Sequence, residues 1–151
     1  MRSARDSGEM VGATAVYATP LRLQASIHTT CSGVLAMAKR GQGGWLGRLE
    51  DGAELSPIER AVRVTDSVRV CESVDKRHSN FDANAEILEA AGLIGTSVRL
   101  DSQAKYVVVA RGDADVYLRL PAQKGYVEKI WDHAAGSLLA EEAGQIGRAH
   151  V

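Results

Sequence analysis

The sequence predicts an α/β or α+β domain with a mixed sheet. Strand-like and helix-like segments alternate along the chain, and no internal repeat or low-complexity segment interrupts them. The 151 residues, of which 45% are hydrophobic and 25% charged, suit one globular domain with a sizeable core. The longest purely apolar runs, such as residues 107–110, are far shorter than the roughly 18 residues of a membrane span. We therefore expect a soluble domain.

The first part of the chain reads mainly as strands. Residues 7–19 predict a turn followed by a strand. Residues 33–39 and 44–49 predict a β-hairpin around the glycine-rich connector 40–43, which lacks the spacing of a Walker loop or a Rossmann fingerprint. The next expected elements are a polar surface loop and two strands, at residues 49–59, 60–64 and 68–73.

The hydrophobic period changes near the middle of the chain. Phe81, Ala85 and Leu88 recur at i, i+4 and i+7, which predicts an amphipathic helix over residues 79–91 with Gly92 as its stop signal. The remaining expected elements are a strand at 97–100, a helix at 103–110, a strand at 115–120 and a last helix that begins near Asp132. That last helix carries an apolar stripe formed by Ala134, Ala135, Leu138, Leu139 and Ala143.

The strand expected at residues 115–120 divides its side chains by alternation. One face receives Val116, Leu118 and Leu120, and the opposite face receives Asp115, Tyr117 and Arg119. Arg119 is therefore expected to face away from the aliphatic core.

The charge, the cysteines and the absence of a secretory signal limit which partners, cysteine chemistry and compartment we expect. Eighteen Lys and Arg against 19 Asp and Glu leave a net charge of -1, so nothing in the whole chain indicates a nucleic acid or a membrane surface as partner. Cys31 and Cys71 lack the spacing of a zinc or redox motif and are expected to be buried or half-buried thiols. No stretch resembles the apolar part of a secretory signal, which favours a cytoplasmic protein and leaves an organellar one open. The oligomeric state stays unknown.

Five polar residues at the ends of predicted elements could carry chemistry. Asp132 is either a helix N-cap or a Mg²⁺ ligand beside a phosphate held by backbone amides. The hydroxyl of Ser102 either caps the next helix or meets a phosphate oxygen, with Lys105 one turn on supplying positive charge. Arg119 is either an ion-pair partner or a bidentate phosphate ligand. His78 is either a solvated or capping histidine or a ligand contact.

Three strings in the second half resemble one family of phosphatases. They are DSQAKY at residues 101–106, ADVYLRLP at 114–121 and EKIWDHAAG at 128–136. They resemble the 3'(2'),5'-bisphosphate nucleotidases, a branch of the lithium-sensitive, inositol monophosphatase-like phosphatases. The tryptophan-aspartate element is shared across that superfamily, whereas DSQAKY, YLRLP and the stretch KRHS at 76–79 indicate the nucleotidase branch. The resemblance is close from about residue 33 to residue 144.

The resemblance implies a fold, a reaction and a set of site residues. The fold is a layered sandwich of helices and mixed sheet, of which this chain would form the C-terminal half. The reaction is the Mg²⁺-dependent, lithium-sensitive removal by water of the 3'-phosphate of 3'-phosphoadenosine 5'-phosphate, giving AMP and clearing a by-product of sulfate assimilation. Residues that match nucleotide contacts are His78, Ser102, Lys105, Arg119 and Asp132, and Asp132 also matches a metal ligand.

The sequence also departs from the family's pattern. It lacks the D-P-x-D-G-T metal motif and the upstream glutamate and aspartate that bind metal and activate water, so no catalytic residue is assigned in this chain. We expect a C-terminal fragment in which residues 1–32 match weakly, 33–144 form part of a phosphatase domain, and 145–151 are a non-native tail. The last six residues are what ATC GGA AGA GCA CAC GTC encodes, a string that resembles a sequencing-adapter end. Genomic sequence that reads through GQIGRAHV would contradict this hypothesis.

Two other functions stay open at this point. The chain could be a non-catalytic nucleotide binder or an inactive fragment, which the missing metal ligands favour for the isolated polypeptide. It could also belong to an inositol phosphate phosphatase of the same superfamily.

Overall fold

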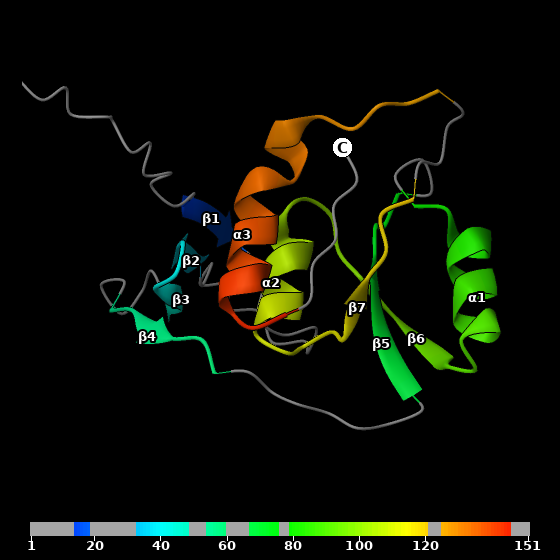
Figure 1. Ribbon diagram of the computed structural model, residues 1–151, viewed down its shortest axis with the longest axis horizontal. Coiled ribbons are helices and arrows are strands. Elements are labelled where there is room, and N and C mark those ends of the chain that lie inside the picture. The colour runs from blue at the N-terminus through cyan, green and yellow to red at the C-terminus, as the bar shows by residue number, and fades with distance from the viewer. Residues whose placement is uncertain are drawn as a thin grey trace, which may run out of the picture.

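Layers of sheet and helix alternate across the molecule (Figure 1). The computed structural model describes the backbone of residues 14–18 and all atoms of residues 33–48, 54–59, 67–75, 79–120 and 125–145. Within these ranges, an antiparallel sheet, a pair of helices, a parallel sheet and one outer helix follow one another. The expected layered sandwich is confirmed, and its two strand directions are divided between two sheets.

The antiparallel sheet has the strand order β1-β2-β3-β4. Its strands are Thr14–Ala18, Gly33–Lys39, Gly43–Arg48 and Ser56–Pro57. The expected hairpin is confirmed, because β2 and β3 pair antiparallel and the Gln42 amide donates to the Lys39 carbonyl at 2.9 Å across the turn. Gly41 and Gly43 have φ angles of +71° and +97°, which residues with a side chain rarely adopt. The strand expected at residues 60–64 lies outside the described residues.

The parallel sheet has the strand order β6-β5-β7. Its strands are β5 (Ser67–Glu72), β6 (Ile94–Arg99) and β7 (Val116–Tyr117). The strand expected at 68–73 is confirmed, and β6 begins three residues before the expected start at residue 97. β7 is shorter than expected, because its pairing with β5 ends at Tyr117.

Helix α1 (Phe81–Ala90) covers the outer face of the parallel sheet, on the right of Figure 1. The Asn80 side chain caps it by accepting from the Ala83 amide at 3.2 Å. Gly92, with a φ angle of +69°, ends it, and its amide donates to the Glu89 carbonyl. The helix and its stop signal are confirmed, but the expected apolar face is only partly covered, since Ile87 is 43% exposed.

Helices α2 (Ala104–Ala110) and α3 (Ala134–Glu142) fill the space between the two sheets. α2 contains three consecutive valines, which are weak helix formers, and all three are buried. Because packing on both sides outweighs propensity, this segment is helical. The core facing the antiparallel sheet consists of Val34, Ala36, Ala38, Val107, Ala110, Leu138, Leu139 and Ala143. The core facing the parallel sheet consists of Cys71, Val108, Val109 and Ala114.

The expectation that the face carrying Tyr117 and Arg119 points away from the core is wrong. Tyr117 packs against the core cluster of the parallel sheet, and its ring meets that of Tyr106 edge-on with the centroids 5.1 Å apart. The alternation argument assumed one solvated face, but α1 and α2 lie on opposite faces of this sheet (Figure 1). Arg119, two residues further, has a side chain that is only 26% exposed.

Neither cysteine chemistry nor a membrane span is indicated in the described part of the chain. Cys71 is buried and unpaired, as expected, and burial raises the pKa of its thiol to about 12, so it is inert at neutral pH. Cys31 lies outside the described residues. No helix within the described ranges is long and apolar enough to cross a bilayer.

Candidate anion site at the edge of the parallel sheet

The carboxyl ends of the three parallel strands meet at one edge of their sheet. Ser73 follows β5, Ser102 follows β6 by three residues, and Arg119 follows β7 by two. Ligands of open α/β sheets bind at this edge, because the strand order leaves a crevice between the connections there. Four of the five residues expected from the sequence lie at this edge, and His78 lies outside the described residues.

Arg119 is fixed by a carboxylate. Its Nη2 atom lies 2.7 Å from Glu128 Oε2 and 3.9 Å from Asp132 Oδ2. Burial acts to lower the pKa of Arg119, but the interactions with Glu128 and with Tyr117 together outweigh burial and hold that pKa above its ordinary value. The guanidinium is therefore charged at every relevant pH, in a partly buried position.

Lys105 places a second cation at the same edge. The residue is 4% exposed, and its Nζ atom donates to Ser73 Oγ at 3.1 Å and to the Leu100 carbonyl at 3.4 Å. Nζ also lies 5.6 Å from the centroid of the Tyr117 ring. Burial lowers the pKa of Lys105, and no carboxylate of the described residues is within ion-pair distance of it. The charge of Asp101 acts against this lowering, but Asp101 forms no ion pair with Lys105 among the described residues. A buried cation without an ion pair favours an anionic ligand.

Ser102 serves the backbone of α2. Its Oγ accepts from the Ala104 amide at 3.3 Å, although Gln103, and not Ser102, stands at the N-cap position of α2. Ser102 has a φ angle of +68° and is the one non-glycine residue with positive φ in the part of the chain that the structure describes. Such strain is found most often at functional sites. The neighbouring Gln103 side chain donates to the backbone carbonyl of Asp132, which joins α2 to the segment before α3.

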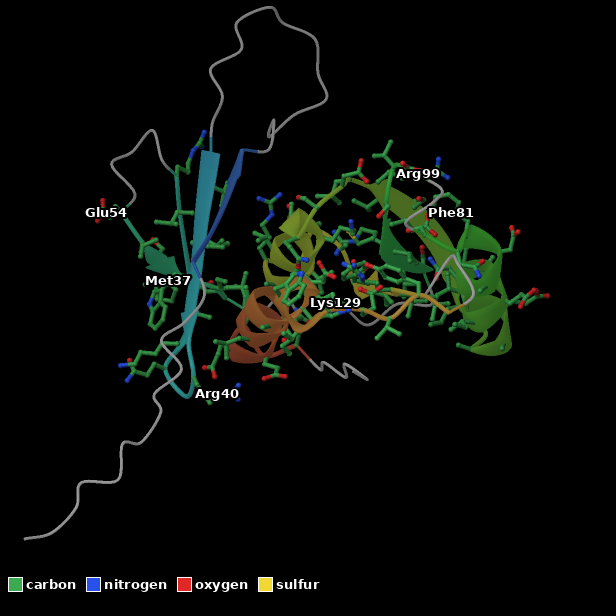
Figure 2. The ribbon with its side chains drawn as sticks, turned by 90° about the horizontal axis from the view of Figure 1, so that it is seen from above. Met37, Arg40, Glu54, Phe81, Arg99 and Lys129 are labelled. Carbon is green, nitrogen blue, oxygen red and sulfur yellow. The ribbon has the colours of Figure 1, made fainter. Side chains whose placement is uncertain are left out.

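Asp132 does not cap the last helix. It ends the short 3-10 helix η3 (Ile130–Asp132), and His133 is the residue that precedes α3. Of the two roles left open for Asp132, the N-cap of the last helix is thus wrong, because the chain makes a separate turn closed by the His133 amide and the Ile130 carbonyl at 3.1 Å. Asp132 Oδ2 instead accepts from the Lys129 amide at 3.3 Å. Figure 2 labels Lys129 in this segment, between the two sheets.

Three site residues were not expected from the sequence. Glu128 Oε2 lies 3.2 Å from His133 Nε2, and His133 Nδ1 lies 2.9 Å from the Tyr106 hydroxyl. The Tyr106 ring rests on Gly136 of α3, where an added Cβ would collide with it. Glu128 and His133 flank the tryptophan-aspartate pair in sequence, but no periodicity or spacing rule marks them as partners of Arg119.

A divalent metal ion would find one ligand here. Asp132 has a side chain that is 27% exposed, and its Oδ1 has no partner among the described residues. No group of three or more His, Cys, Asp or Glu in the described ranges could hold a metal ion. Mg²⁺ is commonly held by one or two carboxylates together with water and substrate phosphates, so a single free carboxylate oxygen fits such an ion.

Comparison with known proteins agrees with this fold and extends over most of the chain. A sequence model described as the inositol monophosphatase family matches residues 15–148. The 3'(2'),5'-bisphosphate nucleotidase of Emericella nidulans is 45% identical over 116 residues, which cover 75% of this chain and 33% of that protein. The protein of the same name in Schizosaccharomyces pombe is 40% identical over 122 residues, covering 79% of this chain and 34% of that one.

A solved structure has the same fold. The crystal structure of CysQ from Bacteroides thetaiotaomicron, a bacterial member of the inositol monophosphatase family, superposes with a TM-score of 0.58 at 21% identity. The match covers 75% of this chain and 44% of that one. The chain spans about a third of the length of the two curated fungal relatives. By the extent of the family match, the chain belongs to the inositol monophosphatase family.

Proposed function

We propose that this chain forms the phosphate-binding wall, and supplies one metal ligand, of a phosphatase that converts 3'-phosphoadenosine 5'-phosphate into AMP and inorganic phosphate. One observation carries the proposal: Lys105 and Arg119 bring two cations to the edge of the parallel sheet where Asp132 offers a free carboxylate oxygen. The fungal relatives are named 3'(2'),5'-bisphosphate nucleotidases, which supports a nucleotide carrying two phosphates as the substrate.

Each residue has a defined part in this proposal. Arg119 and Lys105 balance the negative charge of phosphate oxygens, and the Ser102 hydroxyl donates to one of them. Asp132 is one ligand of a Mg²⁺ ion, and the further ligands come from the substrate, from water and from outside the described residues. When bound, Mg²⁺ polarises the phosphoryl group and lowers the pKa of the attacking water. The water oxygen bonds to phosphorus while the bond from phosphorus to the 3'-oxygen breaks, and the proton that water loses ends on the 3'-oxygen of AMP. A cytoplasmic location and lithium sensitivity belong to the same proposal.

The first test is ligand binding to the 151-residue chain by titration calorimetry. We expect 3'-phosphoadenosine 5'-phosphate and AMP to bind competitively and inositol 1-phosphate to leave that binding unchanged. Arg119→Ala should weaken binding about tenfold or more, since it removes a charge-assisted hydrogen bond. Arg40→Ala is the matched control, because Arg40 lies exposed at the far end of the hairpin (Figure 2). Equal binding by wild type and Arg119→Ala would contradict the proposal.

A second candidate is a nucleotide binder without catalysis. The absence of any three-residue metal cluster in the described ranges favours it for the isolated chain. Phosphate release from 3'-phosphoadenosine 5'-phosphate, measured with and without Mg²⁺ and with added Li⁺, separates the two. Mg²⁺-dependent and Li⁺-sensitive release supports the phosphatase, whereas binding without release supports the second candidate.

A further inference from the structure

Glu128 lies between Arg119, which the proposed function uses, and His133. Its side chain, 16% exposed, belongs to the segment that leads into η3. The Oε2 atom lies 2.7 Å from Arg119 Nη2 and 3.2 Å from His133 Nε2. One carboxylate oxygen thus lies close to both Arg119 and His133, the residue that precedes α3.

His133 is held from its other side. The residue is 8% exposed, and its Nδ1 atom lies 2.9 Å from the Tyr106 hydroxyl on α2. The imidazole is thus held from both sides, by the Tyr106 hydroxyl at Nδ1 and by Glu128 Oε2 beside Nε2. The Tyr106 ring is itself confined between Tyr117 and Gly136. The chain of contacts from Tyr106 to Arg119 is therefore anchored in packed helices.

We infer that Glu128 is a positioning residue, which holds the Arg119 guanidinium in place for the anion through the chain Tyr106, His133 and Glu128. The identity of the anion rests on the proposed function. A long arginine side chain loses rotamer freedom when it binds, and a guanidinium that is already fixed loses less. A fully exposed ion pair would contribute little to such fixing, but this one is partly buried and braced from behind.

Asp132 is a second carboxylate near Arg119. Asp132 Oδ2 is the next carboxylate oxygen, 3.9 Å from Arg119 Nη2. In a chain without Glu128, the guanidinium is expected to move onto Asp132. That movement would withdraw the cation from the phosphate and the carboxylate from a metal at once.

The test compares Glu128→Ala and Glu128→Gln with wild type and with Glu86→Ala. Glu86 is an exposed residue of α1, so that variant matches the loss of one negative charge. The first readout is the ¹⁵N spectrum of arginine side chains without ligand, with Arg119 assigned by Arg119→Lys. The second is the dissociation constant of 3'-phosphoadenosine 5'-phosphate. Tyr106→Phe, which keeps the ring and removes the hydroxyl, tests the far end of the chain of contacts.

Positioning and simple electrostatics predict opposite changes in anion binding for Glu128→Ala. Removing a negative charge beside an anion site should tighten anion binding by simple electrostatics. Positioning predicts that Glu128→Ala weakens it about tenfold, that Glu128→Gln weakens it less because its amide oxygen still accepts from Arg119, and that Tyr106→Phe has a smaller effect of the same sign. It also predicts that the separate Nη signals of Arg119 merge in Glu128→Ala and persist in Glu86→Ala, because rotation about the guanidinium bonds is freed.

Each outcome bears on a separate claim. Tighter or unchanged binding by Glu128→Ala, or Arg119 signals that do not respond, would overturn the positioning role. If wild type fails to bind the nucleotide while the Arg119 signals still merge in Glu128→Ala, the positioning role is supported and the proposed function is overturned.

Discussion

Lys105 keeps an ammonium group where a folded protein would ordinarily place an apolar side chain. The residue is 4% exposed, and burial lowers its pKa below the ordinary value of 10.5. Below the folded-state pKa the group is charged in both states, so its burial reduces the free energy of unfolding. As pH rises from the folded-state pKa toward 10.5, the folded protein releases the proton first and this loss of stability shrinks. Because the buried charge of Lys105 reduces the free energy of unfolding, its position favours a role in binding over a role in stability.

Lys105→Met should raise the free energy of unfolding and weaken nucleotide binding. We expect the variant to be more stable than wild type at pH 7, on the order of 1 kcal/mol, and to bind 3'-phosphoadenosine 5'-phosphate about tenfold more weakly. The gain in stability should be smaller at pH 10, as the sign argued above requires. Urea unfolding at the two pH values measures it, with Lys129→Met as a control at an exposed lysine. A stability difference that grows with pH would contradict the argument.

At the scale of elements, α2 and α3 approach closely where α3 lacks a side chain. Gly136 is buried, and the Tyr106 ring occupies the space of its missing Cβ. That close approach lets the Tyr106 hydroxyl reach His133. One glycine therefore sets both the spacing of two helices and the first contact of the chain that leads to Arg119.

Gly136→Ala should destabilise the protein by about 1–3 kcal/mol, because the added methyl group collides with an aromatic ring in a packed interface. The sign is informative, since glycine to alanine in an unhindered helix interior stabilises by up to about 1 kcal/mol. Urea unfolding at pH 7 measures the change. An unchanged or raised midpoint would show that Tyr106 has another place to go.

A second contact between elements fastens the hairpin to the end of α3. Glu142 accepts from the Gly41 amide at 2.7 Å through Oε1 and from the Gly43 amide at 2.8 Å through Oε2. These two hydrogen bonds lower the pKa of Glu142 below its ordinary value of 4.5. The stabilisation from this carboxylate is thus complete above pH 4.5 and is lost as pH falls through the lower, folded-state pKa.

Glu142→Gln should lower the urea midpoint at pH 7, because an amide can accept only one of the two bonds. The difference from wild type should narrow as pH falls from 4.5 through the folded-state pKa, because the wild-type carboxyl is then protonated in the folded protein as well. Glu141→Gln is the matched control, because Glu141 is the neighbouring acid and its described contact is a 3.9 Å ion pair with exposed Arg40. Equal effects of the two substitutions would remove any special role from Glu142.

At the scale of the whole molecule, features that depend on neighbouring residues were predicted better than features that depend on tertiary contacts. The hairpin follows from the glycines at 40–43, and α1 follows from its period and from Gly92. The face of Tyr117 and Arg119 was wrongly expected to lie away from the core, because alternation cannot tell that helices cover both faces of a sheet. His78 and the strand at 60–64 lie outside the described residues and stay predictions.

The candidate site shows the same division. Lys105, Arg119 and Asp132 stand out by residue type at the ends of elements, and strand order β6-β5-β7 brings them to one edge. Glu128 and His133 do not stand out, because their role depends on which side chains meet after folding. Asp132 was given the wrong local geometry, since an acid before a helix reads alike with or without an intervening 3-10 turn.

The contact between Glu142 and the hairpin turn also bears on the order in which parts of the fold form. Its two hydrogen bonds join positions 101 and 99 residues apart, whereas the hairpin itself closes between neighbouring residues. Contacts at such separation form late, because the intervening loop must first be closed. During synthesis the hairpin emerges from the ribosome long before residue 142 does. The antiparallel sheet therefore lacks this contact until residue 142 has been synthesised, and its edge is open to pairing with another nascent chain in that interval.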